Sequence, residues 1–129
     1  MNKKILITAS VFGVLSVVLG AFAAHGLKEL ITEQALQSFE TGVRYQMYHA
    51  FLLLFIGTID KLTIKTKKAV FFLVITGVFL FSGSIYGLAT NALSGFDFKQ
   101  IALITPFGGL LLIVAWIVMG LGFTRNVDN

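Results

Sequence analysis

Four long apolar stretches, almost free of charge, constrain the fold of this chain more than any other feature. They cover approximately residues 5–24, 45–59, 69–93 and 101–123. A helix crosses the hydrocarbon core of a membrane with roughly 17 to 25 mostly apolar residues. Backbone groups in lipid must be hydrogen-bonded within their own segment, so each stretch is expected to be helical. The sequence therefore predicts an all-α membrane protein, a bundle of four transmembrane helices.

The composition agrees with a protein whose surface faces lipid. Hydrophobic residues make up 57% of the 129 residues and charged residues 12%, about half the charged share of a typical soluble domain. The length fits one domain, residues 1–129. The absence of cysteine excludes disulfides, thiolate nucleophiles and iron–sulfur ligation. The net charge of +4 comes from basic residues in short connections, so we expect the lipid bilayer, not nucleic acid, as the partner.

The first apolar stretch resembles a secretory signal because two lysines precede it and small residues end it. Signal peptides have an apolar stretch of about 7 to 15 residues. Here the apolar run 5–24 has 20 residues, which is long enough to span a bilayer. We expect an uncleaved first helix.

The distribution of basic residues predicts the orientation, because lysine and arginine are retained on the cytoplasmic side. With four crossings, both termini and the 60–68 connection share one face. That face carries seven basic residues: Lys3, Lys4, Lys61, Lys65, Lys67, Lys68 and Arg125. The opposite face carries three: Lys28, Arg44 and Lys99. We predict a multi-pass protein with its N- and C-termini in the cytoplasm.

The segment 27–41, between the first two stretches, is amphipathic. Its apolar residues recur at helical spacing: Leu27, Leu30, Ile31, Ala35 and Phe39. Thr32 is a suitable N-cap, and Glu33 is favourable in the first helical turn. The pattern predicts an amphipathic helix in the outer interface or resting on the bundle, with a bend at Gly42. One long helix, continuous with the second crossing, is the alternative.

Small residues at four-residue spacing indicate where helices approach one another closely in lipid. The candidates are Ser16, Gly20 and Ala24 in the first helix, Gly83 and Gly87 in the third, and Pro106, Gly108 and Gly109 in the fourth. Pro106 lacks a backbone donor, so we expect a kink in the outer part of the fourth helix. These residues serve either packing within one chain or a contact between chains, which leaves a homo-oligomer open.

One dense polar cluster lies at the outer end of the second helix: Arg44, Tyr45, Gln46, Tyr48 and His49. Helical spacing places Glu40, Arg44 and Tyr48 on one face, and Glu40 is the expected partner of Arg44. His25 ends the first helix on the same side of the membrane, and His49 is expected about one turn deeper. These seven residues are the candidate ligand- or lipid-binding site.

Each of these residues also has a structural interpretation. His25 and the glycine after it are typical of a helix C-terminus, with the glycine in the left-handed conformation. Tyr45 and Tyr48 are typical interfacial anchors, and the Arg44 guanidinium is well shaped to hold a lipid phosphate. For His49, a hydrogen bond to a tyrosine or to the backbone is the alternative to a ligand role.

Missing residue types restrict the chemistry further. None of the four stretches contains aspartate or glutamate, so proton-coupled export is not expected. The chain has two histidines, no phosphate-binding loop and no metalloprotease motif. We therefore predict no catalytic residue, no metal and no cofactor.

Three functions are compatible with these residues. The first is a non-enzymatic protein that binds a lipid or another amphiphile, or stabilises a partner, through the outer polar cluster. The second is a redox protein in which His25 and His49 hold a haem or a quinone. The third is a small channel or carrier. The first agrees best with the lack of acid–base and metal-binding groups.

Four sequence blocks resemble one protein family. They are residues 20–27 (GAFAAHGL), 39–50 (FETGVRYQMYHA), 81–84 (FSGS) and 105–109 (TPFGG). In this order they are similar to the YgdD-like small membrane proteins, a family of unknown function (DUF423, also UPF0382). One departure is Ala115 before Trp116, where the family tends to have glycine. The resemblance implies a bacterial plasma-membrane protein and supplies no activity, but it draws attention to the histidines and the polar cluster.

Overall fold

The computed structural model describes residues 1–93, 97 and 102–126, and over these it contains helices and no strands. Its four long helices are α1 (Asn2–Ala24), α2 (Glu33–Thr58), α3 (Ile64–Ala89) and α4 (Ile104–Asn126). Two short 3₁₀ turns, η1 (Leu27–Glu29) and η2 (Asn91–Leu93), follow α1 and α3. The prediction of an all-α chain with four long helices is confirmed for this part of the sequence.

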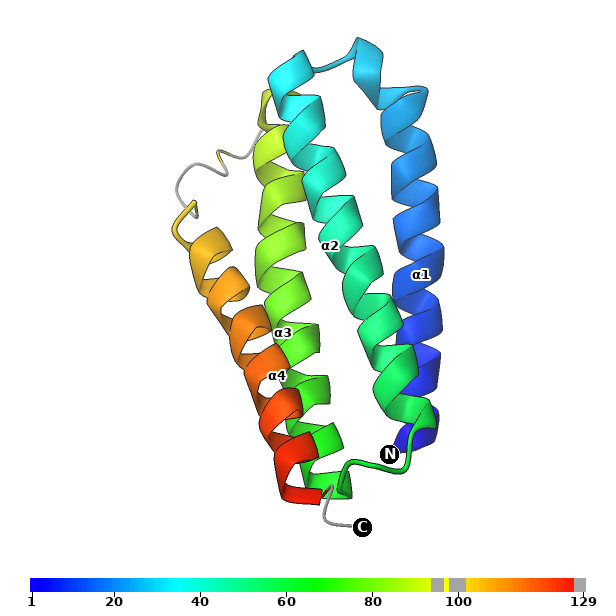
Figure 1. Cartoon of the computed structure of the whole chain (residues 1–129). Helices are drawn as coiled ribbons and strands as arrows, with labels where there is room; N and C mark the ends of the chain where they lie inside the picture. Colours follow the sequence, from blue (N-terminus) through cyan, green and yellow to red (C-terminus); the bar gives the residue numbers. More distant parts are fainter. Residues whose placement is uncertain (94–96, 98–101, 127–129) are drawn as a thin grey trace.

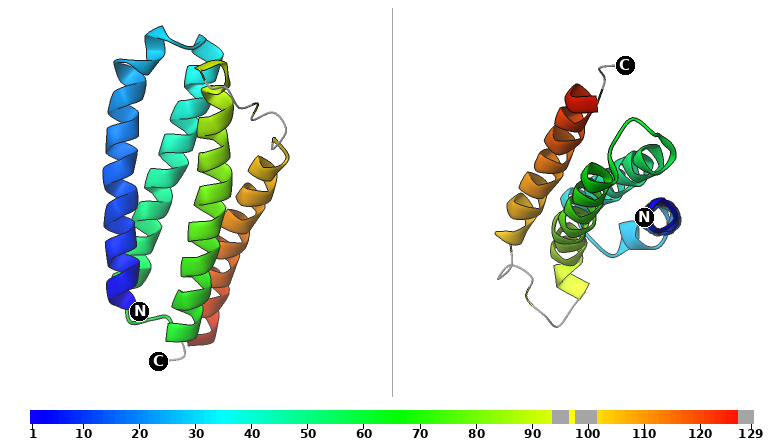
Figure 2. Two further views of the ribbon diagram at one scale, coloured as in Figure 1. Left: turned by 180° about the vertical axis from the view of Figure 1, so that it is seen from behind. Right: turned by 90° about the horizontal axis from the view of Figure 1, so that it is seen from below.

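The helices lie side by side and alternate in direction along the chain (Figure 1). Seen along the bundle, α2 and α3 form the middle, and α1 and α4 flank them on opposite sides (Figure 2). Met1 and the end of α4 lie at the same end of the molecule (Figure 1). α2 packs between α1 and α3, and it also reaches α4 through a hydrogen bond between His49 and Trp116.

Threonine side chains start both middle helices. The backbone N–H of Ala35 donates to Thr32 Oγ1 at 3.1 Å, and that of Thr66 donates to Thr63 Oγ1 at 3.1 Å. Such caps satisfy amide groups that have no partner in the first turn of a helix. The predicted N-cap at Thr32 is confirmed, and the cap at Thr63 explains why α3 begins before the predicted residue 69.

The outer half of α2 differs from the amphipathic segment predicted for residues 27–41. α2 is one continuous helix, so its first turns occupy residues 33–41, and of the two arrangements the single long helix is observed. Gly42 does not mark a bend. It is buried within α2, and a Cβ there would lie 2.8 Å from Cε1 of Tyr86. Glycine is needed at this position because α3 comes close, not because the chain turns.

Two predicted features of helix ends are wrong. Pro106 lies in the first turn of α4, where amide groups have no intrahelical partner, so it fits without the expected kink. At the end of α1, His25 is the C-cap, but Gly26 has φ of −78° and is not left-handed. The chain continues directly into η1 with right-handed geometry, so no glycine-specific conformation is required. The predicted first residue of the fourth helix, 101, lies outside the described residues.

The helices differ in how well they suit a lipid environment. α1 together with η1, α3 and α4 are each long and apolar enough to cross a membrane, whereas α2 is not among these candidates. Large apolar side chains are exposed on the outer helices, including Val17 (63%) on α1 and Ile113 (57%) on α4. Lipid tails are as apolar as such side chains, so this exposure carries no penalty in a bilayer.

Two of the three predicted packing residues of α1 lie in the contact with α2, and the third lies on the surface. Ser16 is buried and bonds to the carbonyl of Phe12 at 2.8 Å. A Cβ at Gly20 would lie 3.6 Å from Val43 of α2, in ordinary contact. Ala24 is exposed. The first two therefore form part of the α1–α2 contact.

The two predicted glycines of α4 lie in the contact with α3, whereas Gly83 of α3 lies on the surface. A Cβ at Gly108 would overlap the backbone nitrogen of Phe81 and lie 2.8 Å from the carbonyl carbon of Leu80, so α4 rests on the α3 backbone here. A Cβ at Gly109 would touch the Phe81 ring at 3.5 Å. Gly83 is exposed with no atom within 4 Å of such a Cβ, and Gly87 is half-buried. The G-x-x-x-G pattern of α3 thus does not form a tight helix contact at Gly83.

Candidate functional site

One face of α2 is buried against the other helices. Its residues follow one another at alternating steps of four and three: Gly42, Gln46, His49, Leu53 and Ile56. This spacing is typical of a seam between packed helices. Gln46 and His49 are 5% and 3% exposed, so two of the predicted site residues lie inside the bundle.

Gln46 connects three helices. Its Nε2 donates to the carbonyl oxygen of Phe12 on α1 at 2.9 Å, and its Oε1 accepts from the hydroxyl of Tyr86 on α3 at 2.7 Å. One turn earlier, the Ser82 hydroxyl donates to the carbonyl of Gly42 at 2.7 Å. Polar groups buried between membrane helices are stabilised by such interhelical bonds. These bonds fix the depth and rotation of α2 relative to α1 and α3.

Both ring nitrogens of His49 are hydrogen-bonded. Nδ1 lies 2.6 Å from the carbonyl oxygen of Tyr45, and Nε2 lies 3.1 Å from Nε1 of Trp116. A carbonyl oxygen only accepts and an indole N–H only donates. Nδ1 therefore carries the proton and Nε2 accepts, so His49 is a neutral imidazole without a free lone pair.

A groove of about 480 Å³ runs between α2 and α4. α2 contributes Tyr45 and His49, α3 contributes Phe81, and α4 contributes one face from Pro106 to Trp116. Ligand sites in proteins have volumes of about 300 to 1,000 Å³. Trp116, Leu110 and Ile113 of α4 are 48%, 54% and 57% exposed, so the groove opens on the outside of the bundle.

Tyr45 supplies an available polar group to this groove. It is 41% exposed, its ring packs on Phe81 with a centroid distance of 5.1 Å, and its hydroxyl bonds to none of the described residues. A second groove, of about 340 Å³ between α1 and α3, contains Gln46 and Tyr86, which already bond to each other. The α2–α4 groove is therefore the better candidate for a ligand with a polar group.

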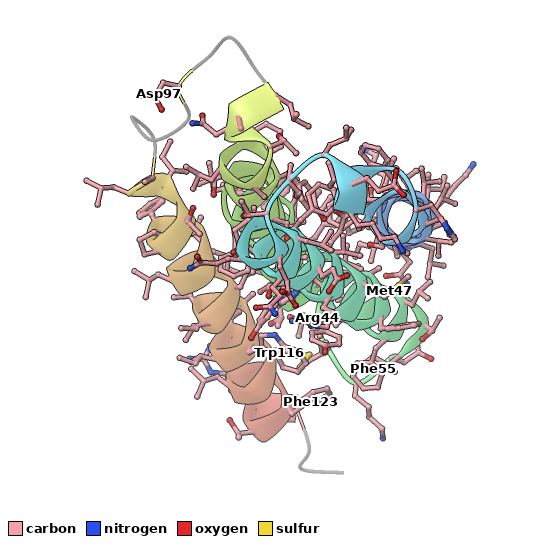
Figure 3. All side chains as sticks on the ribbon, turned by 90° about the horizontal axis from the view of Figure 1, so that it is seen from above. Arg44, Met47, Phe55, Asp97, Trp116 and Phe123 are labelled. Atoms are coloured by element: carbon pink, nitrogen blue, oxygen red, sulfur yellow. The ribbon has the colours of Figure 1, made fainter. Side chains whose placement is uncertain are left out.

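The remaining polar residues of α2 face outward. Arg44 is exposed, and its Nη2 donates to Thr41 Oγ1 at 3.0 Å. In the part of the chain that the structure describes, no ion pair joins Arg44 to Glu40, which was its expected partner. Tyr48 is 51% exposed. The view along the bundle shows Arg44 on the open side of α2, next to the gap towards α4 in which Trp116 lies (Figure 3).

The two histidines are not brought together. Phe22, in the last turn of α1, packs against Phe39 with a centroid distance of 6.4 Å, so the end of α1 is level with Phe39. His49 is ten residues further along α2, about 15 Å at 1.5 Å per residue. The expected offset of one turn from His25 is therefore wrong, because α2 starts earlier than predicted.

This separation bears on the redox alternative. Histidine nitrogens bind metals at about 2 Å, so His25 and His49 do not reach one iron atom or one quinone carbonyl. His49 has both nitrogens engaged, and His25 is exposed at the end of α1. Among the described residues, no group of three or more metal-ligating side chains is present. No contact on these residues favours a haem or quinone site.

Four side chains that join the helices were not among the predicted site residues; three lie in this region, and Lys67 lies at the other end of the bundle. Ser82 and Tyr86 anchor α2 to α3, and Trp116 anchors His49 to α4. Lys67 is 3% exposed, and its ammonium donates to the carbonyl of Ile59 at the end of α2 and to Asn2 at the start of α1. A usable signal existed for Trp116, the single tryptophan of the chain, because an indole N–H inside an apolar span requires an acceptor.

Sequence comparisons identify the family to which these residues belong. The profile of the family "Protein of unknown function (DUF423)" matches residues 19–109. The chain belongs to the DUF423 family. The matched region of this DUF423 protein includes all of α2 and ends in the α4 wall of the groove, which confirms the resemblance carried by the four sequence blocks.

Relatives of this DUF423 chain are named membrane proteins. A UPF0382 membrane protein of Haemophilus influenzae is 36% identical over 126 residues, covering 98% of both chains. The UPF0382 membrane protein YwdK of Bacillus subtilis is 39% identical over 119 residues, covering 91% of this chain and 93% of YwdK. No solved structure matches the chain. Together with its apolar helices, these relatives identify a membrane protein of an uncharacterised family.

Proposed function

We propose that this DUF423 protein binds an amphiphile from the membrane, with one hydrocarbon chain of the ligand in the α2–α4 groove. The observation that carries the proposal is the groove itself, which opens on the outside of the bundle and exposes the Tyr45 hydroxyl. No acid–base pair or activated nucleophile accompanies this hydroxyl among the described residues. Binding, and not catalysis, is the activity that such a lining supports.

The length of the groove fits one leaflet. From Pro106 to Trp116, α4 advances ten residues, about 15 Å, which is half of a hydrocarbon core of about 30 Å. The wall between them presents apolar side chains, and Gly109 leaves space in it. His49 and Trp116 are hydrogen-bonded to each other, so the deep part of the groove requires no polar partner from the ligand. Tyr45 is left to bond to the head group.

This proposal includes the arrangement in the membrane. All four helices cross the bilayer of a bacterial plasma membrane, and both termini are cytoplasmic. The common end of Met1 and α4 supports this orientation, since the basic residues Lys3, Lys4, Lys61, Lys65, Lys68 and Arg125 belong to that end. α2 crosses as a middle helix, because Gln46 and His49 are turned to protein and not to lipid. Alkaline phosphatase fused to the C-terminus should be inactive; an active fusion would contradict the orientation.

Native mass spectrometry of protein extracted with its lipids tests the ligand proposal. Gly109→Leu fills the groove from the α4 wall, whereas Gly120→Leu adds the same side chain to an open part of α4. Wild type and Gly120→Leu should retain an amphiphile, and Gly109→Leu should lose most of it. Equal retention by all three proteins, or none by the wild type, would overturn the proposal.

Tyr45→Phe provides a second variant that keeps the ring against Phe81 and removes the hydroxyl. It should fold like the wild type, because the hydroxyl bonds to none of the described residues, and it should retain less amphiphile. Unchanged retention would remove Tyr45 from the proposed site. Circular dichroism and size-exclusion chromatography would verify the fold of each variant.

A further inference from the structure

The outward face of α2 has the spacing of a second helix seam. Its residues recur at steps of three, four, three, four and three: Gln37, Glu40, Arg44, Met47, Phe51 and Leu54. These six residues, called the outer seam, have the spacing of the a and d positions that meet a neighbouring helix in a coiled coil. The buried seam from Gly42 to Ile56 shows the same alternation on the other side of α2. The neighbouring helices bury this seam and the α2 residues beside it, and they leave most of the outer seam uncovered; the further buried residues are Phe39, Ala50, Leu52 and Gly57.

Four of the six outer-seam residues are exposed, and Glu40 and Met47 are half-buried. Phe51 is 61% exposed and Leu54 is 38% exposed, while Gln37 and Arg44 are also exposed. In the view along the bundle, Arg44 lies on the side of α2 that is turned away from α3 (Figure 3). The exposed residues of this face are therefore available to a neighbouring helix.

The charges of the outer seam indicate what covers it. A Cβ at Gly20 of α1 would touch Val43, so Arg44 lies about one turn inside the end of α1. Charged side chains at membrane depth generally have a partner. An anionic lipid head group would pair with Arg44 but would be repelled by Glu40. A second copy of the chain offers a carboxylate to Arg44 and a guanidinium to Glu40.

We propose that two copies of the protein associate through the outer seam, in the same membrane orientation, with Arg44 of each copy paired to Glu40 of the other. At about 100° per residue, Glu40 and Arg44 are separated by about 40° around α2. They flank the centre line of the seam, which passes through Phe51. A two-fold axis along the membrane normal then places each Arg44 beside the Glu40 of the second copy. This pairing stands apart from the groove ligand and does not depend on it.

Disulfide cross-linking in membranes tests the interface, because the chain has no cysteine of its own. Phe51→Cys places a thiol on the centre line, and Phe79→Cys places one outside the seam, at an α3 residue that is 75% exposed and lines the α1–α3 groove. Mild oxidation should convert Phe51→Cys to a dimer and leave Phe79→Cys monomeric. Absent cross-linking of Phe51→Cys, or equal cross-linking of both variants, would overturn the proposal.

Charge reversal separates a second copy from a lipid phosphate as the partner of Arg44. In the Phe51→Cys background, Arg44→Glu should lower cross-linking about tenfold, because it brings like charges together across the seam. Adding Glu40→Arg restores opposite charges and should restore cross-linking. Failure of the double variant to recover, with the dimer of the parent variant intact, would assign Arg44 to a lipid head group and contradict the pairing.

Discussion

The bond between Gln46 and Tyr86 predicts a measurable coupling between α2 and α3. Hydrogen bonds between membrane helices contribute about 0.6 kcal/mol on average and up to about 1.7 kcal/mol. Gln46→Leu removes two bonds, to Phe12 and to Tyr86, and leaves the Tyr86 hydroxyl without its acceptor. A buried polar group without a partner costs about 1 to 3 kcal/mol. The free energy of unfolding should therefore fall by about 2 kcal/mol for Gln46→Leu and by about 1 kcal/mol for Tyr86→Phe.

A double-mutant cycle isolates the shared bond. The Gln46→Leu/Tyr86→Phe protein should lose about 1 kcal/mol less than the sum of the single losses, since residues in one hydrogen-bond network are not additive. Steric trapping or reversible unfolding in mixed detergent micelles measures these values. Ser10→Ala is the control, because Ser10 is exposed and bonds only to Leu6 of its own helix. A coupling below about 0.3 kcal/mol, within the scatter of independent sites, would refute the bridge.

Three further predictions follow from neighbouring contacts. Trp116→Phe leaves His49 Nε2 without its donor and should lower the free energy of unfolding by about 1 kcal/mol. In the wild type, ¹⁵N NMR at neutral pH should show the His49 imidazole protonated at Nδ1, and protonation at Nε2 would contradict the assignment. Gly108→Ala should lower the free energy of unfolding by about 1 to 3 kcal/mol because its Cβ meets the α3 backbone, whereas Gly83→Ala should not destabilise the protein. Equal melting temperatures for the two variants would show that α4 does not rest on α3. Lys67→Met should cost about 1 to 3 kcal/mol because the carbonyl at the end of α2 loses its donor, and Lys68→Met, at an exposed site, should leave chemical unfolding unchanged.

Sequence reasoning succeeded where a local rule determines the structure. Three of the four predicted apolar runs correspond to helices that are long and apolar enough to cross a membrane, and these runs and the cap at Thr32 required only hydropathy and first-turn chemistry. It failed where a helix is held by tertiary contacts. α2 extends to Glu33 because its outer turns pack Phe39 and Leu36 in a small apolar cluster with Leu27 of η1, so the helix persists through a polar stretch. Gly42 looked like a bend because the close approach of Tyr86 is not visible in sequence.

The sequence predicted which residues belong to the candidate site but not how their side chains are arranged in space. The residue types were informative, since Gln46 and His49 are buried polar groups within an apolar helix. Their partners come from α1, α3 and α4, and spacing within one segment contains no information about them. The predicted depth of His49 was wrong for a related reason, because it depends on the residue at which α2 begins. The groove could not be predicted, since three helices form it.

Fluorescence of Trp116 tests most directly whether the α2–α4 groove holds a hydrocarbon chain, because this is the single tryptophan of the protein and it lines the groove. The protein is reconstituted in nanodiscs of unlabelled lipid and titrated with an amphiphile that carries bromine on its chain. Occupation of the groove predicts quenching that saturates at a low mole fraction of the brominated amphiphile in the wild type and in Gly120→Leu, and that is lost in Gly109→Leu. Quenching that rises in proportion to the brominated amphiphile, and equally in all three proteins, would show only contact with bulk lipid and would contradict the groove as a binding site.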